Sequence, residues 1–204
     1  MKNYTKKVTI LAKLEQLLSN SSINDNNLDI YLDKYKINKK VFYSLFPKKL
    51  SSLSIFYFEK SYLIAIKKSK TRILKEKSIS KKNKLIVLEF LKNFFNNKNL
   101  SIFFLNYIFF KPFLFSRSIY KIASNIWYDI GDKSIDFNYY TKRLILYNII
   151  RNSFFYWRKN QDLEATLFFT ENQIGFFGKL GKYKSMGKNR LKEIVSTLRK
   201  KKSM

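Results

Sequence analysis

Apolar residues along this chain recur mostly at intervals of three and four positions, and the Asn-Gly, Asp-Gly and Gly-Gly dipeptides that mark β-hairpin turns are absent. These intervals match the period of an amphipathic helix, so the pattern predicts an all-α protein. Apolar runs bounded by polar clusters predict helices over residues 10–18, 28–35, 39–45, 47–64, 85–95, 100–110 and 134–157, with one more from residue 162 onward.

Three short helices followed by a longer one are typical of the start of a helix-turn-helix domain. Pro47 suits the first turn of the fourth helix because its φ is fixed near the helical value. The third helix carries Lys39, Lys40 and Tyr43, residue types that contact DNA phosphates and grooves from a recognition helix. Taken alone, this part of the chain predicts a TetR-type DNA-binding transcription regulator.

The most hydrophobic stretch, residues 100–115, contains Asn106, Lys111 and Pro112. Its longest uncharged part is shorter than the ~20 residues that span a bilayer, so we interpret it as a buried helix that breaks at Pro112. Six phenylalanines in and before this stretch either fill the core or line a lipid pocket, and the pattern leaves both open. They are Phe90, Phe94, Phe95, Phe103, Phe104 and Phe110.

Another run of large residues, between positions 137 and 157, steps by three or four and predicts one long apolar seam on a helix. Ser134 fits the N-cap of this helix, and Asp136 in its first turn favours the helix dipole. The seam consists of Phe137, Tyr140, Leu144, Tyr147, Ile150, Phe154 and Trp157.

Charge and composition narrow the function. The 204 residues include 41 Lys and Arg against 14 Asp and Glu, a formal net charge of +27. A charge of this size is typical of proteins that bind nucleic acid or anionic membranes, although part of it reflects a compositional bias spread along the whole chain. The chain has no His and no Cys, which excludes thiol nucleophiles, disulfides, zinc sites built on these residues and His-dependent triads. A site made from carboxylates, Lys or Tyr stays possible, although only 14 acidic residues could supply it.

Three carboxylates surround a glycine: Asp129, Asp132 and Asp136 are spaced three and four apart around Gly131. Such a cluster could hold a metal ion or perform acid–base chemistry. Gly131 should interrupt the helix, however, and basic residues lie close by in the sequence. We favour helix capping and ion pairing for these carboxylates, with Lys133, Lys142 and Arg143 as partners.

The charge is most concentrated at the end of the chain, where residues 179–202 hold ten basic residues and the single acid Glu193. Apolar residues there fall at i, i+3, i+4 and i+7, which predicts a basic amphipathic helix that lies on anionic lipid. The alternative is a solvated basic tail. The membrane-binding residues in this interpretation are Leu191, Ile194, Val195 and Leu198 with Lys188, Arg190 and Lys192.

Residues 126–143 read IWYDIGDKSIDFNYYTKR. A Trp followed by Gly-Asp-x-Ser-x-Asp-Phe-Asn-x-Tyr-Thr-Lys-Arg resembles the signature of the coenzyme Q nine family, lipid-binding accessory proteins of ubiquinone biosynthesis. Residues 45–47 and 169–174 extend the resemblance, which covers about residues 10–184. The signature residues in this chain are Gly131, Asp132, Ser134, Asp136, Phe137, Asn138, Tyr140, Thr141, Lys142 and Arg143.

The resemblance implies a TetR-like helical bundle, a homodimer, and an isoprenoid lipid site in place of the regulator's ligand pocket. It implies no catalysis and no cofactor beyond the bound isoprenoid quinone or phospholipid. The family presents quinone intermediates to the di-iron demethoxyubiquinone hydroxylase, coenzyme Q seven, so Trp127 and Tyr128 are the expected partner-binding pair. Ser124 stands where the family often has an acidic residue. With this resemblance, nucleic acid is no longer the expected partner.

The predicted organisation has three parts: a helix-turn-helix-like part at residues 1–66, lipid-binding and dimerisation helices at 67–184, and the basic amphipathic helix at 185–204. The chain has no apolar run suited to a signal peptide near its start. We expect a cytoplasmic bacterial protein that is peripheral on the inner membrane, with the mitochondrial matrix side as the alternative.

Overall fold

The computed structural model describes residues 2–20 and 23–178, and over these residues it contains helices and no strands. The predicted all-α class is therefore confirmed. The helices are α1 (Lys2–Asn20), α2 (Leu28–Lys34), α3 (Lys39–Leu45), α4 (Lys49–Lys75), α5 (Ile79–Phe95), α6 (Lys98–Phe109), α7 (Pro112–Asp129) and α8 (Asp136–Asn160). Residues 163–178 are also helical and are called the last helix below.

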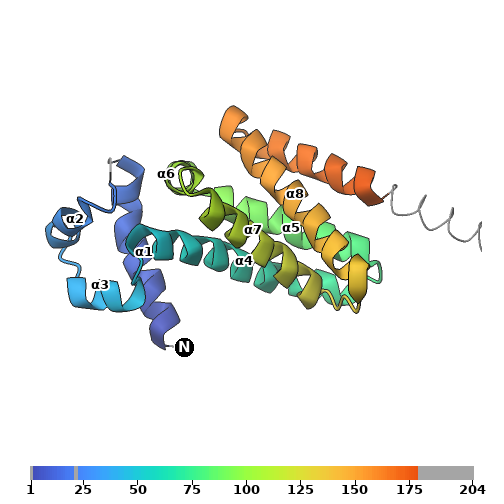
Figure 1. Ribbon diagram of the computed structural model, residues 1–204, viewed down its shortest axis with the longest axis horizontal. Coiled ribbons are helices and arrows are strands. Elements are labelled where there is room, and N and C mark those ends of the chain that lie inside the picture. Colours follow the sequence, from blue (N-terminus) through green and yellow to red (C-terminus); the bar gives the residue numbers. More distant parts are fainter. Residues whose placement is uncertain (1, 21–22, 179–204) are drawn as a thin grey trace, which may run out of the picture.

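The helices form two groups joined by α4 (Figure 1). Helices α1, α2 and α3 lie together at one end, while α4, α5, α7, α8 and the last helix form a bundle. Within the bundle α4 packs mainly on α5, and α7 packs on α8. Because α4 runs from residue 49 to residue 75, the predicted boundary at residue 66 lies inside a continuous helix. The predicted part 185–204 lies outside the described residues.

The aromatic side chains between residues 85 and 115 mainly fill the core. Phe94 packs edge-on against Phe154 with centroids 4.7 Å apart, and Tyr57 stacks on Phe104 at 4.4 Å. Phe95 stacks on Trp157 at 4.3 Å. Of the six phenylalanines in question, Phe90, Phe94, Phe95 and Phe104 are buried, Phe103 is half-buried and Phe110 is 85% exposed.

The carboxylate of Asp25 attaches the three N-terminal helices to the bundle. Its Oδ1 accepts a hydrogen bond from the backbone N–H of Leu50 (3.1 Å), and its Oδ2 accepts from the Tyr107 hydroxyl (2.7 Å) and Lys111 Nζ (3.1 Å). Burial alone would raise the pKa of Asp25, but these hydrogen bonds outweigh burial and lower the pKa from its ordinary value of 3.8. One ionised side chain thus satisfies the start of α4 and the corner between α6 and α7.

The two prolines lie at different positions relative to the helices than the pattern predicted. Pro47 does not start α4: the chain turns first, Lys49 takes a positive φ of 48°, and the helix begins there. Pro112 does not merely end a helix, since it is the first residue of α7, a helix that the pattern did not predict. Its fixed φ suits a first turn, where the missing N–H has no intrahelical partner in any case.

The predicted seam on α8 is wrong in its first half. Tyr140 and Leu144 are 65% and 54% exposed, whereas Ile150, Phe154 and Trp157 are buried. The seven seam residues are separated by six intervals of three or four positions, which together span 20 residues. Six helical turns need about 21.6 residues. The seam residues therefore do not stay on one face and move gradually around the helix. Ser134 is not the N-cap either: Ile135 occupies that position and makes no side-chain cap.

No single helix in the described part of the chain is long and apolar enough to cross a membrane. Helices α6 and α7 taken together are long and apolar enough, but the pair is bent by 119°.

Candidate functional site

The turn between α7 and α8 is built on Gly131. This glycine has a φ of +80°, in the left-handed region that favours glycine over other residues. The Gly131 N–H donates to the Tyr128 carbonyl (3.0 Å), and the Asp132 N–H donates to the Trp127 carbonyl (3.0 Å). These two bonds form a Schellman motif, which ends α7 and satisfies its last carbonyls. Gly131 interrupts the helix as the sequence predicts.

Asp132 is the centre of the polar contacts in this turn. Its Oδ1 accepts hydrogen bonds from the Ser134 hydroxyl (2.6 Å) and from Lys142 Nζ (2.8 Å), and its Oδ2 lies 3.4 Å from Arg143 Nη1. The Asp132 and Arg143 side chains are only 2% and 4% exposed. The predicted ion pairing of Asp132 is therefore confirmed, and Ser134 binds this carboxylate instead of capping α8.

The ionised form of Asp132 is favoured. Burial acts to raise its pKa, but the hydrogen bonds from Lys142 and Ser134 and the charge of Lys142 outweigh that effect and lower the pKa from 3.8. Arg143 has two further contacts: its Nη1 donates to the Tyr139 carbonyl (2.9 Å), and its guanidinium lies 3.4 Å from the centre of the Tyr139 ring. A buried charge network thus ties the start of α8 to the end of α7.

The remaining signature residues are divided between surface and interior. Asn138 and Tyr140 are exposed and Thr141 is half-buried. For Asp136 and Phe137 the structure describes the backbone and not the side chains.

Trp127 and Tyr128, the predicted partner-binding pair, have different surroundings. Tyr128 is 79% exposed. Trp127 is half-buried: its indole N–H donates to the Lys142 carbonyl (3.1 Å), and Lys142 Nζ lies 5.1 Å from the centre of the ring. The structure therefore presents one aromatic side chain to solvent and packs the other against α8.

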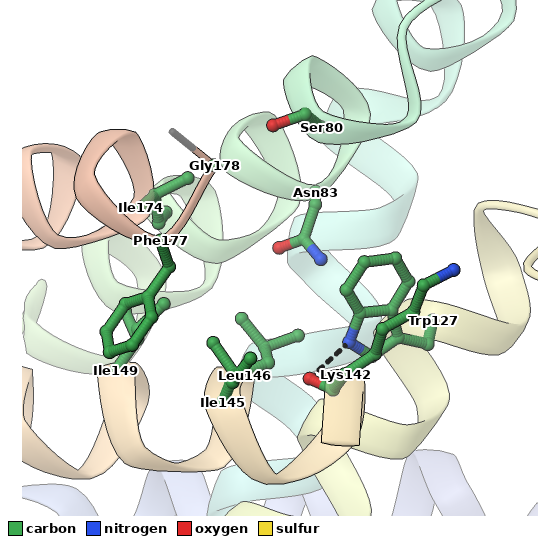
Figure 2. Close-up of a pocket in the computed structure, with 10 residues that line it drawn as sticks. All are labelled: Ser80, Asn83, Trp127, Lys142, Ile145, Leu146, Ile149, Ile174, Phe177 and Gly178. Atoms are coloured by element: carbon green, nitrogen blue, oxygen red, sulfur yellow. Dashed lines mark hydrogen bonds between the residues drawn. The ribbon is translucent and has the colours of Figure 1, made fainter. Parts of the chain in front are cut away.

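Trp127 also forms one wall of a cavity of ≈ 250 Å³ between α5, the end of α7, α8 and the last helix. Figure 2 shows the apolar side chains of α8 and the last helix facing the Trp127 ring and α5 across this space. The lining residues are Ser80, Asn83, Trp127, Lys142, Ile145, Leu146, Ile149, Ile174, Phe177 and Gly178. None of the six phenylalanines considered in the sequence is among them.

Sequence reasoning missed most of this cavity. Ile145, Leu146 and Ile149 have helical spacing and line the cavity. The predicted seam instead placed the apolar face of this part of α8 at Tyr140, Leu144 and Tyr147. Asn83 lies in the polar run 80–84, before the predicted helix 85–95, so no sequence signal marked it as a cavity residue. The contribution of the last helix depends on packing between distant segments.

Two of the three carboxylates around Gly131, those of Asp129 and Asp132, are engaged in structural contacts. The Tyr62 hydroxyl, on α4, donates a hydrogen bond to Asp129, and burial together with this bond raises the pKa of Tyr62 above its ordinary value. Asp132 is held by the basic residues of α8 as described above. Within the described part of the chain, no group of three or more carboxylates is placed to hold a metal ion.

Two of the three predicted DNA-contacting residues on α3 contact acidic residues of the neighbouring helix. Lys39 Nζ lies 2.6 Å from Asp33, whose hydrogen bond raises the pKa of the lysine, and the Tyr43 hydroxyl donates to Asp29 at 2.6 Å. Both acids belong to α2, while Lys40 is exposed. The predicted membrane-binding residues, 188–198, lie outside the described residues.

These features define an all-α protein whose apolar cavity lies beside a turn held by buried charges. Residues 114–181 match the family model described as COQ9. This match confirms the resemblance to the coenzyme Q nine family over those residues and implies an accessory role in ubiquinone biosynthesis. Comparison with curated proteins gave no match, and comparison with solved structures gave none either. The likeness to TetR regulators therefore stays a prediction.

The charge network makes a stability prediction. Asp132→Asn keeps the shape of the side chain but leaves Arg143 buried without its counter-charge, so the free energy of unfolding at neutral pH should fall by about 3 kcal/mol. Because the pKa of Asp132 is lowered in the folded protein, the carboxylate stabilises above its unfolded pKa of about 3.9 and loses that effect as the pH falls through the folded pKa. The difference between the two proteins should therefore shrink in acid.

Urea unfolding followed by circular dichroism measures this difference. The control is Glu171→Gln, which removes an exposed ion pair with Lys84 in the same half of the molecule and should change stability by less than about 1 kcal/mol. Equal stability of wild type and Asp132→Asn at neutral pH would contradict the role given to the network.

Proposed function

We propose that this chain is a membrane-associated lipid-binding protein of ubiquinone biosynthesis that presents isoprenoid quinone intermediates to a di-iron demethoxyubiquinone hydroxylase. The observation that carries the proposal is that the cavity and the COQ9 match coincide. Of the ten lining residues, only Ser80 and Asn83 precede residue 114, so eight lie within the matched segment 114–181.

The chemistry of the cavity suits an isoprenoid ligand. Its walls are chiefly aliphatic and aromatic side chains, and burying each CH₂ of a ligand against such walls contributes about 0.8 kcal/mol. This gain offsets the loss of apolar contacts when the lipid leaves the bilayer. A volume of ≈ 250 Å³ is slightly below the roughly 300–1,000 Å³ of ordinary ligand pockets. We therefore propose that the cavity holds the head group or a short part of the tail, not a whole long-chain quinone.

The accessory role leaves the reaction to the partner. In this proposal the chain buries and orients the lipid, and the hydroxylase supplies the iron chemistry. Tyr128 contributes an exposed aromatic contact at the end of α7, and its neighbour Trp127 reaches the cavity. The partner surface and the ligand site would thus be adjacent, which suits transfer of a ligand between proteins.

Membrane association and dimerisation belong to the same proposal. The sequence pattern of residues 188–198 supports docking on an anionic inner membrane, from the cytoplasmic side of a bacterium or the matrix side of a mitochondrion. Phe168 and Phe176 of the last helix and Phe155 of α8 are exposed apolar side chains, and in this proposal they contribute to an interface between two copies. The alternative, DNA binding through α3, has no specific observation in its favour.

Filling the cavity tests the proposal. Ile145 is half-buried and lines the cavity, so Ile145→Trp should occupy the space that a lipid needs. We expect wild type to co-purify with isoprenoid quinone or phospholipid, and the variant to lose about tenfold in bound lipid because no room remains. Solvent extraction and mass spectrometry measure the lipid-to-protein ratio. The matched control is Leu144→Trp, one residue earlier and 54% exposed, which should keep its lipid. Lipid-free wild type, or equal loading of both variants, would contradict a ligand site here.

The partner contact is tested at Tyr128. Tyr128→Ala should raise the Kd for the di-iron hydroxylase about 30-fold, since loss of an interface hot spot costs about 2 kcal/mol. Phe113→Ala is the control, because Phe113 is also highly exposed but lies at the opposite end of α7. Titration calorimetry with the purified hydroxylase measures both. If Tyr128→Ala binds as tightly as wild type while Phe113→Ala does not, the contact surface lies elsewhere on the chain.

A further inference from the structure

One polar side chain points into the apolar cavity. Asn83 lies in the second turn of α5 and is only 5% exposed. Figure 2 shows its amide group directed into the space between the Trp127 ring and the side chains of Ile174 and Phe177. The position is therefore neither a helix cap nor a surface site.

The Asn83 Oδ1 atom is buried and has no hydrogen-bond partner among the described residues. Two other polar groups that line the cavity, on Trp127 and Lys142, have partners of their own. The Trp127 indole N–H donates to the Lys142 carbonyl, and Lys142 Nζ donates to Asp132. The other side chains that line the cavity from α8 and the last helix are apolar and offer no donor; they are Ile145, Leu146, Ile149, Ile174 and Phe177.

An unpartnered carbonyl oxygen in an apolar space destabilises the empty protein, because its hydration is lost and nothing replaces it. A leucine would fill nearly the same volume without this penalty. An amide at this position is therefore favourable only when a bound molecule donates the missing hydrogen bond to Oδ1. A ligand with a hydroxyl group does so, since its O–H donates to Oδ1 while its apolar part lies against the aliphatic walls.

We infer that Asn83 is a head-group subsite that accepts a hydrogen bond from a hydroxyl of the ligand, and that the cavity prefers a prenylated phenol or quinol over its methyl ether or an oxidised quinone. This inference rests on the proposed function, because it assigns the class of head group to the same cavity. An ether or a quinone carbonyl has lone pairs only, so it cannot donate to Oδ1 and leaves the oxygen unsatisfied.

Ligand titrations with the full-length chain test the inference, using the fluorescence of Trp127 at the cavity wall as the signal. The probes are geranylphenol, its methyl ether and the corresponding geranylated benzoquinone. We expect wild type to bind the phenol about five- to tenfold more tightly than either of the others, the usual effect of one hydrogen bond. Asn83→Leu should bind all three with similar affinity and should melt at a higher temperature than wild type, since the orphan oxygen is gone.

The matched control is Asn93→Leu on the same helix. The Asn93 amide is outside the cavity and already bonded to Glu89 and Lys68, so this variant should keep the preference for the phenol. Equal binding of the three probes by wild type would overturn the inference and leave the proposed lipid site standing, whereas binding of none of them would overturn both. Retention of the preference by Asn83→Leu would also overturn the inference. The wild-type series is decisive even if Asn83→Leu does not fold.

Discussion

The contact between Asp132 and the basic residues of α8 fixes the relation between α7 and α8. The carboxylate is buried beside Arg143, and hydrogen bonds from Lys142 and Ser134 favour its ionised form. A buried charge with several hydrogen bonds tolerates little displacement, because each bond depends on distance and direction. Gly131 allows the sharp turn that brings these groups together. The position of Trp127 follows from this arrangement, since its indole is hydrogen-bonded to the backbone of Lys142.

The cavity depends on the same constraint. One wall is Trp127, a second is the stretch of α8 that begins at Lys142, and the others come from α5 and the last helix. The charge network therefore sets two walls and leaves the other two to ordinary helix packing. Tyr128, next to Trp127, points to solvent. In our proposal this places the partner contact and the ligand within one short segment, and Asn83 on the opposite wall supplies the polar contact for the head group.

Local signals in the sequence predicted part of the local structure, and they did not predict the geometry of the cavity. Helix α3 begins and ends at the predicted residues, with Asn38 accepting from the Val41 N–H as its cap. The break at Gly131 and the ion pairing of Asp132 followed from residue types a few positions apart. Helix α7 was missed because Pro112 was interpreted as an end, although proline suits a first turn equally well. The cavity could not be predicted because its lining comes from α5, α7, α8 and the last helix, whose mutual positions no local pattern encodes.

The central claim is that an isoprenoid ligand occupies the space between Trp127, α8 and the last helix. Photolabelling with a diazirine-bearing prenylated phenol, followed by peptide mass spectrometry of the full-length chain, tests it most directly. The account predicts labels concentrated in residues 142–149 and 174–178, which line the cavity. Labels on other surfaces with none in these two segments would contradict it.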